Sequence, residues 1–258
     1  LRCVAAHLLD ATEVHPAIAR LAEESNWPEA QLKPLGALPI EDKAREIAIW
    51  RGSECTMNQL VPTWVPDQIV CPNDEKPSEH LQRFIQAVQS RPPVWLRVRA
   101  GFEERLASVL QDMAIAFEPH PRIAAAWRID GSADLRKAVA RCPVAFEIQD
   151  IASQCVGLAC APKAGESWWD ACAGSGGKAL HLEDLQPQIG SIFATDTRPG
   201  ILRELKRRST EAGSRHIRMA LGDAAAMASS KLFEGVLVDA PCSGWGTWSR
   251  QPDARWRA

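Results

Sequence analysis

Apolar residues recur at helical spacing through the first third of the chain and later at strand spacing. The first segment, residues 1–90, therefore predicts a helical region, and it contains no chemical motif. Prolines between positions 28 and 39 and between positions 62 and 66 separate its helices. The predicted helices cover residues 4–24, 40–60 and 78–90.

The second segment, residues 91–146, predicts a small α/β module. Residues 94–99 alternate apolar and basic side chains, which is typical of a half-buried strand. Helical spacing returns directly after this strand. The other expected elements are strands at 123–129 and 144–148 and helices at 102–113 and 133–140.

The third segment, residues 147–258, alternates short apolar strands with helices. This order predicts a parallel sheet with right-handed crossovers, so the fold class is α/β. Pro199 and Gly213 mark the two ends of one helix. The predicted strands are 167–170, 191–195, 217–221 and 235–239, and the predicted helices are 151–160, 178–185 and 199–213.

A glycine-rich turn at 170–178, Asp-Ala-Cys-Ala-Gly-Ser-Gly-Gly-Lys, follows the first of these strands. Its small residues let a ligand approach the backbone, and the amides of the next helix carry partial positive charge. A phosphate-binding P-loop is excluded, because Ala179 follows Lys178 where that motif needs Ser or Thr. The spacing of Gly174, Gly176 and Ala179 fits a dinucleotide site, and S-adenosylmethionine is the remaining possibility.

Acidic residues follow the next three predicted strands. Asp196, Asp223 and Asp239 each lie at or just beyond a strand end, so all three should meet at the edge where the glycine turn lies. Such acids can hydrogen-bond the ribose, the adenine amino group and an amino-acid moiety. The candidate cofactor-binding residues are Cys172, Ala173, Gly174, Ser175, Gly176, Gly177, Lys178, Asp196, Asp223 and Asp239.

A second turn, Asp-Ala-Pro-Cys-Ser-Gly at 239–244, presents a cysteine at the same edge. Pro241 fixes the backbone directly before Cys242, which holds the thiol at the rim of the crevice. A thiol presented in this way can act on a substrate. The candidate catalytic residues are Cys242, Asp239 and Lys178.

These two turns resemble motifs of the RNA cytosine-5 methyltransferases of the Sun or Fmu type, also called RsmB-like. The family's first motif, Asp-x-Cys-Ala-x-Pro-Gly-Gly-Lys, is matched at 170–178 except that Ser175 replaces the proline. Its later motif, Asp-Ala-Pro-Cys-Ser-Gly-x-Gly, is matched at 239–246. Segments 91–97 and 149–154 also look like family segments, a trailing motif is matched loosely at 251–256, and the helical region is similar to a NusB-type RNA-binding extension.

The resemblance implies a Rossmann-like core that uses S-adenosylmethionine to methylate carbon 5 of cytosine in RNA. It implies that residues 172–178 hold the donor, Asp196 the ribose and Asp223 the adenine, with Asp239 between the donor and the target base. In such enzymes a cysteine thiolate adds to carbon 6 of a flipped or unstacked cytosine. That cysteine belongs to a Thr-Cys motif on a later strand, and Cys242 matches the second cysteine, which assists release of the adduct.

Only 16 residues follow Cys242, and the chain begins at Leu1. We therefore expect a piece of a longer methyltransferase, truncated before the Thr-Cys strand, that binds the donor poorly and turns over little or not at all. A degenerate protein without turnover would also fit, as would an enzyme that uses Cys242 as its nucleophile in the manner of DNA cytosine-5 methyltransferases.

Composition adds three expectations. The eight cysteines form no C-x-x-C pair, and the six histidines do not cluster beside them, which argues against a zinc site and suits a reducing cytoplasm. No apolar stretch reaches about 18 residues, so neither a membrane span nor secretion is expected. Residues 91–141 carry an excess of three basic groups in a chain of net charge −2, which is weak support for nucleic-acid binding.

Two other functions stay open. A catalytically silent RNA-binding or ribosome-assembly factor would use the basic module and the helical region. A nicotinamide-dependent oxidoreductase would use the glycine spacing of the first turn. Trp245 and Trp248 follow the cysteine turn and could either stack on a base or pack in a core.

Overall fold

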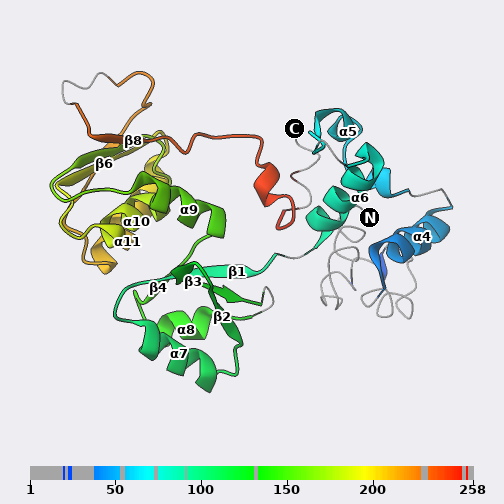
Figure 1. Ribbon diagram of the computed structural model, residues 1–258, viewed down its shortest axis with the longest axis horizontal. Helices are drawn as coiled ribbons and strands as arrows, with labels where there is room; N and C mark the ends of the chain where they lie inside the picture. The colour runs from blue at the N-terminus through cyan, green and yellow to red at the C-terminus, as the bar shows by residue number, and fades with distance from the viewer. Residues whose placement is uncertain are drawn as a thin grey trace. The chain divides into compact units, whose positions relative to one another are not determined.

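The computed structural model describes residues 20, 23–24, 38–52, 56–72, 75–90, 92–130, 133–227, 232–251 and 254. The chain divides into two compact units, one made of residues 1–92 and 243–258 and the other of residues 93–242 (Figure 1). This grouping differs from the three predicted segments, because the second unit joins parts of two of them and the last 16 residues go with the helical region. Most of the predicted helix 4–24 lies outside the described residues.

The first unit is helical. Helix α4 (Ile40–Arg51) has Glu41 and Asp42 in its first turn, where acidic side chains interact favourably with the helix dipole. It ends at Gly52, whose φ of +63° is the left-handed conformation that glycine adopts easily. The predicted helix 40–60 is therefore two elements. The others are η1 (Met57–Leu60), α5 (Val65–Gln68), α6 (Pro77–Gln89) and η2 (Trp245–Thr247).

An aromatic core packs residues 245–248 into this unit. Trp248 is fully buried and packs with apolar residues of η1, α5 and α6. Its ring stacks on Trp245 at 4.9 Å between ring centroids, and both rings contact Trp64 and Phe84. Trp245 and Trp248 therefore have the packing role, which was one of the two roles that the sequence left open.

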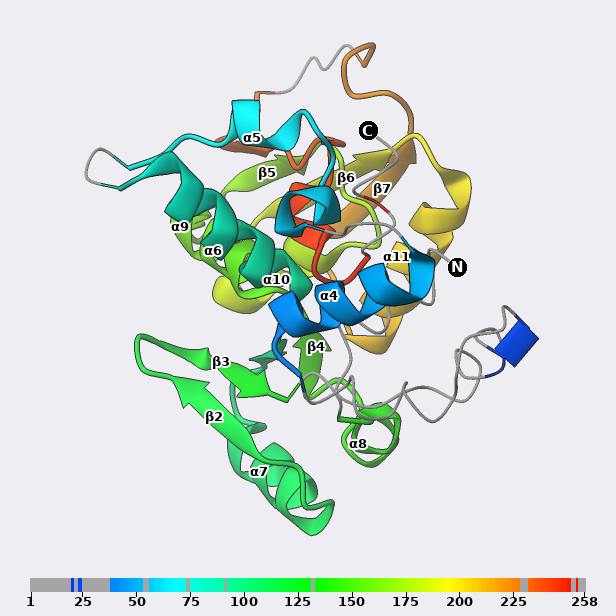
Figure 2. The same cartoon turned by 90° about the vertical axis from the view of Figure 1, so that its right-hand side faces the viewer.

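The second unit begins with a small antiparallel sheet in the order β2-β3-β1-β4, covered on one face by α7 and α8. Figure 2 shows the hairpin of β2 and β3 with α7 beside it. Strand β2 is absent from the sequence prediction, because it is only four residues long and contains Pro119. The elements are β1 (Val94–Val98), α7 (Glu103–Asp112), β2 (Phe117–His120), β3 (Ile123–Ile129), α8 (Arg136–Arg141) and β4 (Phe146–Ile148).

Strand β1 is buried on both faces. Leu96 and Val98 pack in the core under α7 and α8, as the alternation predicts. Arg97 lies on the opposite face and is only 1% exposed. The prediction of a half-buried strand is therefore wrong for Arg97, whose charge is used inside the unit.

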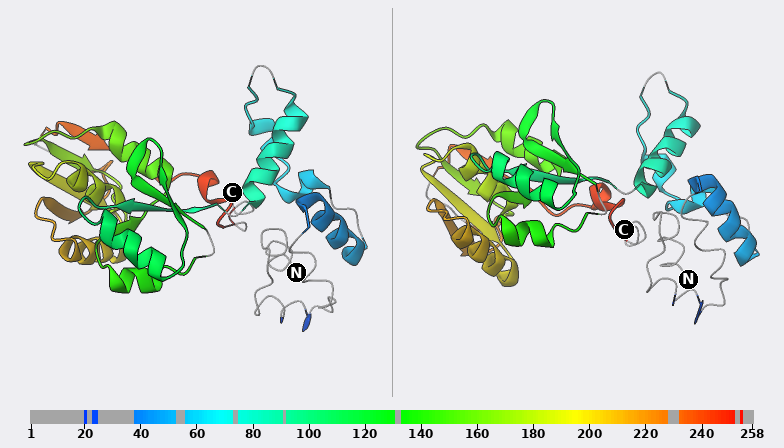
Figure 3. Two further views of the ribbon diagram at one scale, coloured as in Figure 1. Left: turned by 60° about the horizontal axis from the view of Figure 1, so that its bottom comes forward. Right: turned by 90° about the horizontal axis from the view of Figure 1, so that it is seen from below.

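The larger sheet of the second unit is parallel, in the order β7-β6-β5-β8. The α/β fold class is confirmed. Figure 3 shows this sheet with the yellow helix α11 against it. Because the strands are parallel, their carboxyl ends lie at one edge of the sheet. The elements are α9 (Ile151–Cys160), β5 (Ser167–Asp170), α10 (Gly177–Leu185), β6 (Ser191–Asp196), α11 (Pro199–Glu211), β7 (Ile217–Leu221) and β8 (Gly235–Leu237).

Strand order creates the place for a ligand. The chain runs from β5 outward through β6 and β7, then returns to the other side of β5 as β8. This reversal leaves a crevice at the carboxyl ends of β5 and β8, which is where open α/β sheets bind ligands. None of the described helices combines the length and apolar character that crossing a membrane requires.

Candidate active site

A cleft of about 710 Å³ opens at the carboxyl edge of the parallel sheet. It is bounded by the glycine turn, by the segments that follow β6, β7 and β8, and by the start of α9. The structure therefore brings most of the predicted site residues together. The candidates that line it are Cys172, Ala173, Gly174, Ser175, Gly177, Lys178, Asp196, Asp223 and Asp239.

The glycine turn has the tight geometry that its composition predicts. Gly174 and Gly176 have φ values of +55° and +87°, which residues with a side chain rarely adopt. A Cβ at position 176 would lie 2.0 Å from Cδ1 of Leu205 in α11. Gly176 does not line the cleft, so its contribution is to let the turn pack closely against the helix behind it.

Asp170 ends β5 and lies at the floor of the cleft, 1% exposed. The backbone N–H of Cys172 faces this carboxyl, but neither carboxyl oxygen makes a hydrogen bond of normal geometry within the described residues. Burial raises the pKa of Asp170 to about 7, an effect that nearby Lys178 opposes and Asp239 reinforces. A buried carboxyl of this kind is suited to pair with a cationic group of a ligand.

Asp196 ends β6, and its buried carboxylate is held by four donor bonds. The backbone N–H of Gly174 donates at 3.0 Å, and Arg198 donates from its backbone N–H, Nε and Nη2 at 2.9 Å each. Hydrogen bonding to the Arg198 side chain lowers the pKa of Asp196 to about 2. Asp196 therefore stays ionised, ties the glycine turn to β6, and would share its oxygens between Arg198 and any ribose bound there.

Lys178 and Asp239 form an ion pair across the cleft, with Nζ 2.5 Å from Oδ2. The lysine side chain is 14% exposed and the aspartate 57%. The pair joins the first turn of α10 to the segment after β8, so two of the three candidate catalytic residues lie in direct contact.

Asp223 and Cys172 line the cleft with less defined partners. Asp223 follows β7 and accepts a hydrogen bond from the backbone N–H of Ala225 at 2.9 Å. Burial raises the pKa of the Cys172 thiol, and the neighbouring aspartates raise it further. Cys172 is therefore a neutral thiol at the wall of the cleft.

Cys242, the third candidate catalytic residue, is exposed. It directly follows Pro241, which lines the cleft, but Cys242 is not part of the lining itself. The six cysteines that the structure describes are all free thiols.

Several lining residues were not among the predicted site residues. Asp170 was considered only as the first residue of its motif, although its place at the end of a buried strand was a usable signal. Gln149, Asp150 and Ser153 reach the cleft from the start of α9 and lie in a segment that resembles the family. The segment after β6 adds Thr197 and Arg198.

Two arginines of the small antiparallel module pair with acidic residues outside segment 91–141, which offsets part of the basic excess of that segment. Arg97 and Arg99 pair with Asp184, and Arg99 also approaches Glu147 at 3.5 Å. The remaining pairs are Arg128 with Glu118, Arg136 with Asp134, and Arg141 with Asp112. The charge excess of this module is thus weaker support for nucleic-acid binding than the sequence suggests.

A cysteine and a histidine do come together in the helical unit. Cys71, Glu75 and His80 place one potential ligand atom each within 4.8 Å of one another, although the sequence showed no such cluster. Glu75 is already paired with His80 at 2.7 Å and with Arg83. The carboxylate of Glu75 therefore already has two protein partners.

Comparison with known proteins identifies relatives of this site. Residues 157–258 match the family described as 16S rRNA methyltransferase RsmB/F. A ribosomal RNA small subunit methyltransferase B of Shewanella oneidensis is 35% identical over 187 residues, which cover 68% of this chain and 41% of that protein. Another, from Salmonella paratyphi B, is 28% identical over 253 residues, or 94% of this chain, and the chain spans 57% of its length.

Solved structures agree on the fold. A protein titled PH0851 aligns over 93% of this chain and 55% of its own, with a TM-score of 0.70 and 22% identity. A methyltransferase homologue from Pyrococcus horikoshii covers 68% of this chain and 59% of its own, with a TM-score of 0.58 and 24% identity. NSun6 from Pyrococcus horikoshii, solved with SFG, covers 65% of this chain and 68% of its own, with a TM-score of 0.54 and 14% identity. These structures support the fold, and the family and sequence matches confirm the resemblance to an RsmB-like methyltransferase.

Proposed function

Because residues 157–258 match the RsmB/F methyltransferase family, we propose that this chain serves S-adenosylmethionine-dependent methylation of carbon 5 of cytosine in the RNA of the small ribosomal subunit. The relatives named for this activity are longer than this chain, which spans 57% of one and 41% of another. The proposal therefore concerns the part of the reaction that these residues serve.

One observation carries the proposal. The strand ends of one parallel sheet place four carboxyls around a glycine turn, and one of these carboxyls is buried with no hydrogen bond of normal geometry to the described residues. Asp170 at the floor is suited to a cationic group, and Asp196 beside the turn to ribose hydroxyls. S-adenosylmethionine carries a sulfonium, an α-ammonium group and a ribose, so its chemistry fits this donor set. When bound, it supplies an electrophilic methyl group.

The chain's own residues then have distinct tasks. In this proposal the backbone of residues 172–178 cradles the donor, and Asp223, which lines the same cleft, binds the adenine. Asp239, which pairs with Lys178, is proposed to act between the donor and the target base. Cys242 follows the cleft-lining Pro241 and assists release of the RNA adduct, as the family motif implies. The sequence contains no Thr-Cys pair, so we propose donor binding with little or no turnover for these residues alone.

RNA is the proposed macromolecular partner, and a cytoplasmic location follows from that partner and from the free thiols. A flipped or single-stranded cytosine is required, because the reacting carbons are inaccessible within a stacked helix. Arg122 and Lys137 are exposed basic residues of the antiparallel module and are available for phosphate contacts.

Isothermal titration of the 258-residue protein with S-adenosylhomocysteine, and separately with NAD, tests the proposal. We expect saturable binding of S-adenosylhomocysteine, weakened at least tenfold in Asp196→Asn, because a charge-assisted hydrogen bond to the ribose is lost. Binding of NAD alone would overturn the proposal in favour of an oxidoreductase. Salt-sensitive RNA binding with no affinity for S-adenosylhomocysteine or NAD would instead support a silent RNA-binding factor.

The reaction itself is tested with small-subunit RNA and a labelled methyl donor. We expect little or no 5-methylcytosine from the wild-type chain alone. Robust transfer that Cys242→Ala abolishes would contradict the assigned role of Cys242 and make it the nucleophile.

A further inference from the structure

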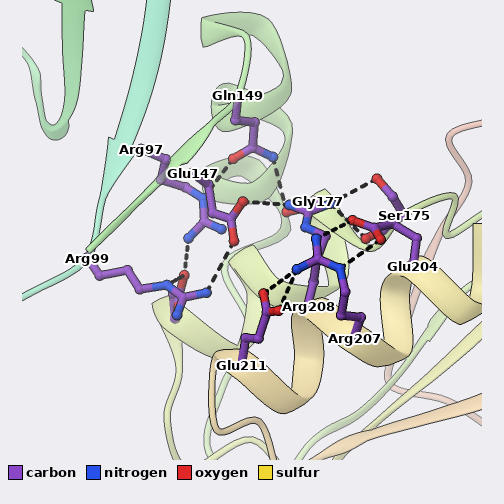
Figure 4. Close-up of polar contacts among 11 residues, drawn as sticks. Arg97, Arg99, Glu147, Gln149, Ser175, Gly177, Glu204, Arg207, Arg208 and Glu211 are labelled. Atoms are coloured by element: carbon purple, nitrogen blue, oxygen red, sulfur yellow. Dashed lines mark hydrogen bonds and ion pairs between the residues drawn. The ribbon is translucent and has the colours of Figure 1, made fainter. Parts of the chain in front are cut away.

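An arginine of α11, Arg208, forms hydrogen bonds with the glycine turn on the side away from the cleft lining. Arg208 donates from Nη1 to the carbonyl oxygen of Ser175 at 2.7 Å and to its hydroxyl oxygen at 2.8 Å (Figure 4). Its Nη2 donates to Oε2 of Glu147 in β4 at 2.6 Å. The guanidinium group therefore bridges the turn and the antiparallel sheet.

The turn gains from such a contact because its glycine-rich backbone can adopt many conformations. Ser175 lies between Gly174 and Gly176, both with positive φ, and glycine loses more conformational freedom on ordering than any other residue. Ser175 also stands where the resembling family motif has proline, so no pyrrolidine ring restricts the turn at this position. Arg208 bonds both polar oxygens that Ser175 offers.

Glu147, the partner of Arg208 in the antiparallel sheet, has a further charged neighbour. Glu147 is half-buried and also lies 3.5 Å from Nη2 of Arg99 in β1. Two positions further along, and therefore on the same face, Gln149 donates to the carbonyl oxygen of Gly177 at 3.2 Å and accepts from Nε of Arg97 at 2.7 Å. The antiparallel sheet thus reaches the turn at two points.

We propose that Arg208 is a positioning residue for the cofactor turn, and that its pairing with Glu147 makes the antiparallel sheet a structural part of the cofactor site. This inference rests on the proposed binding of S-adenosylmethionine. Arg208 does not line the cleft, but Ser175 does, and Arg208 acts through its contact with Ser175. Preorganising the turn lowers the ordering cost that the ligand would otherwise bear, and so raises its affinity.

Arg207 offers a matched control on the same helix. It also pairs with two carboxylates, Glu204 and Glu211, but all three residues belong to α11. Its side chain is 55% exposed, against 17% for Arg208. Arg207→Gln therefore removes the same charge without touching the turn.

Amide hydrogen exchange on the ligand-free protein tests the positioning role without any cofactor. In Arg208→Gln we expect amides of residues 174–178 to exchange about tenfold faster than in the wild type, with α9 and β3 unchanged. Ser175→Ala keeps the carbonyl bond and should give a smaller increase. Arg207→Gln should match the wild type.

Titration with S-adenosylhomocysteine supplies the functional readout. We expect about a tenfold weaker affinity in Arg208→Gln, a smaller loss in Ser175→Ala, and less than a twofold change in Arg207→Gln. Combining Arg208→Gln with Ser175→Ala should add little to the effect of Arg208→Gln alone, because the two residues act through one contact.

Unchanged exchange at 174–178 in Arg208→Gln would overturn the inference, as would equal effects of the Arg207 and Arg208 substitutions. If the wild-type protein binds no S-adenosylhomocysteine, the proposed function fails, whereas the exchange experiment still decides whether Arg208 holds the turn. Uniformly faster exchange throughout residues 93–242 would show general destabilisation and would also count against a positioning role.

Discussion

The two sheets of residues 93–242 use their charged side chains in opposite ways. In the antiparallel sheet, Arg97 is almost fully buried and its charge is met by Asp184, with Gln149 as a further partner. In the parallel sheet, Asp170 is equally buried, yet its carboxyl oxygens lack normal hydrogen bonds within the described residues. In the first arrangement partners within the fold offset much of the cost of burying the charge, whereas the second leaves a free-energy cost that a ligand can offset.

The largest change in stability is expected on substitution of the buried arginine Arg97. Arg97→Met removes a buried partner of Asp184 and Gln149 and leaves Asp184 with Arg99, and should reduce the free energy of unfolding by about 3 kcal/mol. Arg128→Met is the matched control, because Arg128 pairs with Glu118 at the exposed surface of the same sheet, and should cost less than about 0.5 kcal/mol. Urea unfolding measures both, and equal losses would contradict the distinction.

The next effect concerns the packing behind the cofactor turn. Gly176→Ala combines a positive φ with a Cβ 2.0 Å from Leu205, and should cost about 2 kcal/mol or more. Gly213→Ala has a φ of +69° but meets nothing within 4 Å, so only the backbone strain of about 1 kcal/mol remains. Thermal unfolding of both variants separates the two contributions. A Gly213 variant as unstable as the Gly176 variant would remove the packing argument.

A smaller change in stability, of opposite sign, is expected on substitution of the buried acid Asp170. Burial raises the pKa of Asp170 to about 7 in the folded state. Ionisation of this group therefore lowers the free energy of unfolding as pH rises from about 4 to 7. Asp170→Asn should therefore raise stability by about 1–2 kcal/mol at pH 8 and change it little at pH 4, where the native carboxyl is protonated. Unfolding curves at the two pH values provide the measurement. A loss of stability at pH 8 would mean that Asp170 is already compensated within the fold.

Sequence patterns predicted the parallel sheet more closely than the antiparallel one. Helix 151–160 and strand 167–170 were predicted with the bounds observed, because Asp150 caps the helix and the apolar runs are short and well separated. Strand β2 was missed because of Pro119, and helix 40–60 was predicted too long because Gly52 ends it. Local sequence carries such signals only where turn residues mark the boundaries.

The residues of the site were predicted from its sequence motifs, but the contacts that hold those residues in place were not. Asp196, Asp223 and Asp239 reach one cleft because each follows a strand of the same parallel sheet. The bond between Glu147 and Arg208 joins residues 61 positions apart, and no pattern along the chain indicates it. The buried state of Arg97 was hidden for the same reason, since alternation cannot tell a solvent-facing side from one covered by another part of the unit.

The pH dependence of S-adenosylhomocysteine binding tests the central claim most directly, because only the ionised form of Asp170 can pair with a cationic group of the ligand. Its pKa of about 7 predicts affinity that rises roughly tenfold from pH 6 to pH 8, with proton release on binding near pH 6.5. Asp170→Asn should bind weakly and show a flat pH profile. An affinity that is independent of pH in the wild type, or unchanged by Asp170→Asn, would contradict the account.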